Sequence, residues 1–191
     1  MTIFNKKDLL SGLHDRIELI RNNLQPFLRL PDECLLRRPA PGKWSIAEIF
    51  EHLNIMHGAF LQSINKVMHK APINAREAFA TGWLGNWLYN KMMPRTDGTV
   101  FKIKTPRKFH AGPAPLNPKK VLNTFMDQLD EFDHVLELCT YVDLQKIKLP
   151  FVFPRGLKLR LGDGLRFVVA HCERHLLQAR NVLEQAPASE Q

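Results

Sequence analysis

The chain has 191 residues, of which 45% are hydrophobic. That length suits one domain with one hydrophobic core. No apolar run reaches the roughly eighteen residues that a membrane-spanning helix needs. The N-terminal segment also lacks the apolar core and cleavage site of a secretory signal. We therefore expect a soluble, cytoplasmic protein with no membrane partner.

The cysteines and the net charge exclude further classes. The three cysteines are an odd number without C-x-x-C spacing, which argues against a disulfide framework and a zinc knuckle. The net charge of +8 raises the question of nucleic-acid binding. Basic residues gather in segments predicted to be connections, at residues 37–38, 95–108, 119–120 and 155–166. No predicted helix carries a basic stripe with interleaved aromatic residues. A basic rim around a site for an anionic substrate explains the charge as well, and nucleic acid is not an expected partner.

Two long helices are predicted in the first part of the chain. Between residues 6 and 28, apolar residues recur at three- and four-residue steps. The second helix covers residues 45–69 and starts with a capping box, in which Ser45 is followed three residues later by Glu48. His52 falls on the apolar stripe of this helix and should point toward the core, where an imidazole needs a hydrogen-bond partner or a metal.

Two more long helices are predicted nearer the C-terminus, at residues 118–140 and 163–184. Asn117 and Pro118 are typical of a helix start, and Asp163 is a plausible cap for the last helix. Four amphipathic helices, without a series of strands or an internal repeat, predict an all-α, single-domain four-helix bundle over residues 1–191.

The segment between the second and third long helices is less regular. It predicts long crossover connections and a short extra helix at residues 78–93, weakened by two glycines. Trp83 and Trp87 lie four residues apart in this helix. They are candidates for one wall of a substrate pocket, with simple packing as the alternative.

His171 and His175 lie four residues apart in the last helix, so their rings project from one face within reach of a shared metal ion. A lone pair at this spacing also arises by chance, and a third ligand is needed. Helical bundles build metal sites from facing helices, and His52 completes a plausible set of three. Cys172 points about 100° away from His171 and is expected to be a packing residue.

Two stretches resemble the DinB/YfiT-like superfamily: Trp44-Ser-Ile-Ala-Glu48-Ile-Phe-Glu-His52, and His171-Cys-Glu-Arg-His175-Leu-Leu-Gln178. The resemblance implies a DinB-like four-helix bundle that binds a divalent metal (zinc, nickel or iron). By position, its ligands would be His52, His171 and His175. Members of that superfamily include thiol-dependent transferases and isomerases that use low-molecular-weight thiols, and proposed hydrolases.

Three neutral imidazoles leave a metal its full charge and an open position. Such an ion lowers the pKa of a bound water or thiol. Glu48 and Gln178 are the candidates for fixing the histidine tautomers. The sequence thus predicts a metal-dependent transferase or hydrolase that acts on a small molecule, with a low-molecular-weight thiol as a candidate partner. A non-catalytic metal- or ligand-binding, stress-associated bundle protein is the alternative, and a homodimer is a candidate assembly.

Overall fold

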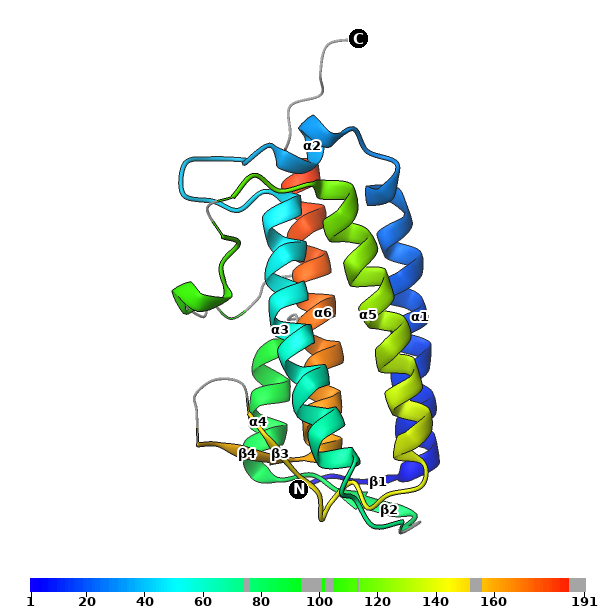
Figure 1. Ribbon diagram of the computed structural model, residues 1–191. Helices are drawn as coiled ribbons and strands as arrows, with labels where there is room; N and C mark the ends of the chain where they lie inside the picture. The colour runs from blue at the N-terminus through cyan, green and yellow to red at the C-terminus, as the bar shows by residue number, and fades with distance from the viewer. Residues whose placement is uncertain (74–75, 94–100, 102–104, 113, 152–155, 186–191) are drawn as a thin grey trace.

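Four long helices lie side by side in the computed structural model: α1 (Lys6–Leu28), α3 (Ile46–Met68), α5 (Pro118–Cys139) and α6 (Leu161–Glu184) (Figure 1). The structure describes the chain except residues 74–75, 94–100, 102–104, 113, 152–155 and 186–191. The predicted all-α four-helix bundle is confirmed. A short helix, α2 (Asp32–Leu36), lies across one end, in a segment that reads as a proline-rich turn.

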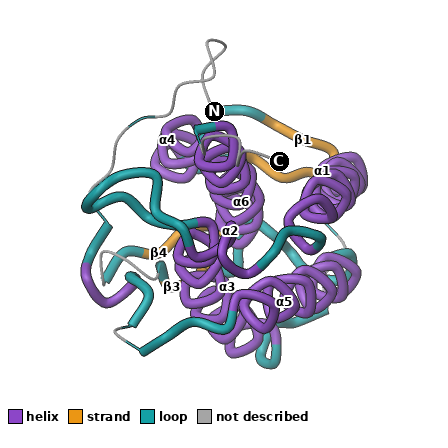
Figure 2. The backbone as a smooth tube through the Cα atoms, turned by 90° about the horizontal axis from the view of Figure 1, so that it is seen from above, coloured by secondary structure: helices purple, strands orange, loops and turns teal. Residues whose placement is uncertain are grey.

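The order of the helices creates a long crossover. In Figure 1, α1 and α6 run upward, while α3 and α5 run downward as parallel neighbours. Helix α3 ends at the lower end of the bundle and α5 begins at the upper end, so the chain between them has to return along the length of the bundle. This return includes α4 (Trp83–Met92), which packs outside the bundle against α6, and the short 3-10 helix η1 (Arg107–Phe109) beside α3 (Figures 1 and 2).

The core lies between the apolar faces of the four helices. Its largest fully buried side chains are aromatic rings, among them Phe27, Phe50, Phe60, Phe125 and Phe132. Each long helix presents the stripe of apolar residues that its three- and four-residue spacing predicts. The helices are thus held mainly by burial of one face, which also fixes which side chains point inward.

A capping box sets the start of α3. The Ser45 Oγ accepts the Glu48 N–H at 3.2 Å, and the Glu48 Oε2 accepts the Ser45 N–H at 2.8 Å. With the first turn fixed, Ile49 and Leu53 face the core. His52 lies on the same side of the helix, so its imidazole ring points into the bundle.

Two small antiparallel sheets lie at the end of the bundle opposite α2 (Figure 1). They pair β1 (Ile3–Asn5) with β2 (Ala78–Ala80), and β3 (Lys148–Pro150) with β4 (Lys158–Arg160). Strands of three residues show too little alternation to be detected from sequence. The short extra helix consequently begins at Trp83, after β2, and not at residue 78 as predicted.

Asp163 is not the cap that the sequence suggested. Strand β4 runs directly into α6, so the helix begins at Leu161 with Arg160 in the N-cap position. The Asp163 carboxylate is buried and accepts the N–H of Gly82 at 2.8 Å, at the start of α4. Burial raises the pKa of this carboxyl group. Asp163 therefore fastens the crossover to α6.

Two other expectations concern charge and membranes. In the basic segment 95–108, residues 95–100 and 102–104 lie outside the described residues. Among the helices that the structure describes, none combines the length and the apolar character required to cross a bilayer.

The packing of α4 against Asp163 predicts a sharp difference between two glycines. An alanine Cβ at residue 85 would lie 2.3–2.5 Å from atoms of the Asp163 side chain, whereas one at Gly12 in α1 meets nothing within 4 Å. We expect Gly85→Ala to lower the free energy of unfolding by about 1–3 kcal/mol. The matched Gly12→Ala should raise it by about 0.5–1 kcal/mol. Urea unfolding measures both, and an equally stable Gly85→Ala would contradict the close packing.

Candidate metal centre

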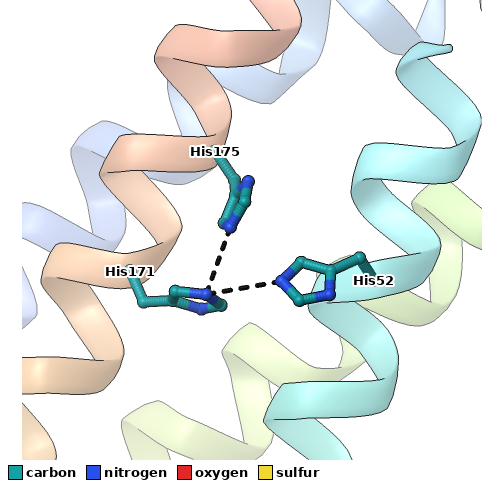
Figure 3. A group of neighbouring side chains, drawn as sticks. All are labelled: His52, His171 and His175. Carbon is teal, nitrogen blue, oxygen red and sulfur yellow. Dashed lines mark hydrogen bonds between the residues drawn. The ribbon is translucent and has the colours of Figure 1, made fainter. Parts of the chain in front are cut away.

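Three histidines from two antiparallel helices meet inside the bundle (Figure 3). The His171 Nε2 lies 3.4 Å from the His52 Nε2 and 3.1 Å from the His175 Nε2. One ligand atom from each ring lies within 4.8 Å of the other two. The predicted trio is therefore assembled by the contact of α3 with α6, and all three side chains are buried.

The outer nitrogens of two rings are held by neighbouring acceptors. The His52 Nδ1 lies 2.7 Å from the backbone carbonyl of Phe109, in η1. The His175 Nδ1 lies 2.9 Å from the Gln178 Oε1, one turn further along α6. Both contacts require the ring to donate from Nδ1, so in the neutral ring Nε2 carries a lone pair. The lone pairs on the His52 and His175 Nε2 atoms are thus both available toward the His171 Nε2.

The convergence of these nitrogens fits a cation. The His171 Nε2 faces both other rings, and a single proton on it can serve only one of them. The lone pair of at least one of the other two rings is therefore left without a donor unless a positive ion lies between the nitrogens. Tetrahedral coordination at 2.0–2.1 Å would set the nitrogens roughly 3.3–3.4 Å apart, close to the 3.4 and 3.1 Å that separate the His171 Nε2 from the other two Nε2 atoms.

Burial keeps the three rings neutral. It lowers the pKa of His52 and brings the pKa of His171 and His175 well below the ordinary value of 6.5. The neighbouring rings and the Arg174 guanidinium lower the pKa of His171 and His175 further. Neutral imidazole is the form that coordinates metals. The cluster is therefore ready to bind a metal at neutral pH without first losing protons.

The remaining predicted site residues lie in different places. Gln178 contacts His175, as proposed. Glu48 does not contact His52, because its carboxylate is used by the capping box and by an ion pair with Arg38. Trp83 and Trp87 lie on α4 with 80% and 52% of their surface exposed. Trp87 lines a surface hollow.

Several neighbours of the cluster were missed from sequence. The Trp44 ring lies 5.2 Å from the rings of both His52 and His110, centre to centre. His57 is fully buried on α3, with its Nε2 2.6 Å from the Cys172 Sγ. The position of His57 four residues after Leu53, on the apolar stripe, is a signal that could have placed it inside. Cys172, expected to be a packing residue, faces this histidine and not the three-histidine cluster.

Comparison with protein families gives one match. The model described as the DinB superfamily matches residues 16–179, which include all three clustered histidines. Neither the curated proteins nor the solved structures gave a significant match.

The buried His57 predicts how stability depends on pH in the metal-free protein. Burial lowers its pKa from 6.5 to about 4, so below pH 6.5 the unfolded chain binds a proton here that the folded chain does not. Stability should therefore fall as the pH drops from 6.5 to 4, by up to about 3 kcal/mol from this ring. Urea unfolding across that range should show a shallower loss for His57→Leu than for the wild type. The exposed His134 is a control, and His134→Gln should keep the wild-type slope. Equal slopes for wild type and His57→Leu would contradict a neutral, buried His57.

Proposed function

The chain belongs to the DinB superfamily, and on that basis we propose that it is a metal-dependent enzyme whose divalent ion is held by His52, His171 and His175. The observation that carries the proposal is the convergence of three Nε2 atoms, with two ring tautomers held by fixed acceptors. Zinc, nickel and iron all accept imidazole nitrogen.

The three side chains supply a particular kind of site. A divalent ion on three neutral imidazoles keeps its charge and an open position, and it lowers the pKa of a thiol or water placed there. The chain does the positioning: the Phe109 carbonyl and Gln178 orient two rings, and burial keeps them unprotonated. Trp44 and His110 pack beside His52.

We propose S-transfer from a small thiol to a small electrophile, with hydrolysis as the other reaction type. Metal-dependent hydrolases commonly add a carboxylate base to the ligand set. Among the described residues, no carboxylate is hydrogen-bonded or ion-paired to the three rings. A thiol needs no such base once its pKa is lowered. Its proton passes to water, its sulfur bonds to the electrophilic carbon, and the leaving group departs with the electron pair.

The metal content of purified protein tests the site. Protein purified without added metal should contain zinc, nickel or iron at close to one ion per chain by elemental analysis. His171→Ala should lose most of it, because two ligands rarely retain what three hold. His134→Ala removes an exposed histidine paired with Glu137 on α5 and should keep the ion. Wild-type protein that stays empty after dialysis against each of the three ions would contradict the proposal.

A substrate panel tests the reaction. The metal-loaded protein should transfer low-molecular-weight thiols to activated electrophiles such as chlorodinitrobenzene, which loses chloride, or an epoxide, whose C–O bond opens. His52→Ala and chelation should abolish turnover, since both remove the ion, and restoring metal should recover the chelated wild type. Hydrolysis of esters and amides, without thiol transfer, would reassign the enzyme as a hydrolase. A loaded protein inactive on both panels would favour the metal-binding protein without turnover.

A further inference from the structure

Arg174 is a buried cation beside the three-histidine cluster. It lies one turn after His171 on α6, next in sequence to His175, and is only 9% exposed. Its positive charge lowers the pKa of both His171 and His175. The Nη2 donates to the backbone carbonyl of Phe101, while the buried Nη1 has no hydrogen-bond partner in the described part of the chain.

Three other arginines of the long helices, Arg16, Arg21 and Arg166, lie beside carboxylates. Arg16 forms a two-point ion pair with Glu173, and Arg21 pairs with Asp130 and Asp133. Arg166 lies 3.7 Å from the Asp163 carboxylate. No carboxylate in the described residues pairs with Arg174. A buried charge without a counterion is costly, so this position is unusual within the same molecule.

The cost increases when the cluster holds its ion. A divalent cation on three neutral imidazoles, together with the guanidinium, places three formal positive charges close together with little water around them. A ligand that brings negative charge relieves this repulsion, and an arginine N–H binds a carboxylate oxygen in a strong, charge-assisted hydrogen bond.

We infer that Arg174 recognises a carboxylate on the small molecule that binds at the metal centre. This inference rests on the metal centre of the proposed function and adds the chemical class of its ligand: a small thiol or electrophile that carries a carboxylate. Arg174 is then a specificity residue, because it binds a part of the ligand that does not react.

The surface near Arg174 suits an anion. Phe101, whose carbonyl holds the guanidinium, also lines a hollow of about 180 Å³ together with Trp87, Asn90, Lys91 and Met93. The Lys91 Nζ lies 4.2 Å from the centre of the Phe101 ring. Lys91 thus places a second cation, and Trp87 an apolar wall, beside the residue whose carbonyl binds Arg174.

Two thiols that differ in one group test the inference. In cobalt-loaded protein, titrations with 3-mercaptopropionate and with neutral 3-mercapto-1-propanol can be followed by the cobalt–thiolate absorption. We expect the wild type to prefer the carboxylate by about tenfold or more, the size of one hydrogen bond to a charged group. Arg174→Met should lose most of this preference, and Arg174→Lys should keep part of it. Arg180→Met removes an exposed arginine of the same helix, which bonds to Asn23, and should behave as the wild type.

The outcomes separate the two proposals. If cobalt binds but wild type and Arg174→Met show the same preference, the carboxylate inference is overturned while the metal centre stands. If no metal binds, the same two thiols are compared by the rise in Tm of the metal-free protein. A rise that is specific to the carboxylate and lost in Arg174→Met would support the anion site without the metal centre. Its absence would overturn the inference as well.

Discussion

The site depends on the removal of three imidazoles from water at the contact between α3 and α6. The His171 Nε2 lies 3.4 and 3.1 Å from the Nε2 atoms of the other two uncharged rings, and such contacts are unfavourable unless a proton or a metal ion lies between the nitrogens. Each part of the fold around them keeps that arrangement in place. The capping box fixes the rotation of α3 about its axis. The packing of α6 against α3 brings His171 and His175 beside His52, and the crossover supplies the Phe109 carbonyl that orients the His52 ring.

The crossover does more than connect two parallel helices. Its first part is fastened to α6 by paired groups, since Asp163 binds the start of α4 and the Arg166 guanidinium lies 4.1 Å from the centre of the Tyr89 ring. Further along, at Phe101, it meets a cation that has no carboxylate partner among the described residues. The start of α6 thus pairs a carboxylate with a guanidinium, Asp163 with Arg166, whereas Arg174 next to the histidines has no carboxylate partner in the part of the chain that the structure describes. The contact of Asp163 with the start of α4 is therefore structural, whereas the surroundings of Arg174 suit a negatively charged ligand.

The long helices could be predicted because their apolar stripes have a clear period, and the three histidines because two lie at helical spacing and the third lies on an inward stripe. The hydrogen-bond acceptors of the histidine rings were harder to predict from the sequence. Gln178 is one turn from its histidine and was found, but the partner of His52 is a backbone carbonyl 57 residues away, which no side-chain pattern marks. Glu48 was a reasonable candidate whose carboxylate is used at the helix start. Asp163 followed a cap pattern, yet burial against Gly82 determined its role.

The separation of the histidines along the chain has a consequence for synthesis. His52 and His171 are 119 residues apart, so their meeting closes a large loop. Such distant contacts form slowly, because the entropy of loop closure opposes them until neighbouring helices are docked. A nascent chain that has not yet released α6 from the ribosome lacks two of the three rings. An ion held by all three rings would therefore be captured only after α6 has been synthesised and has docked against α3.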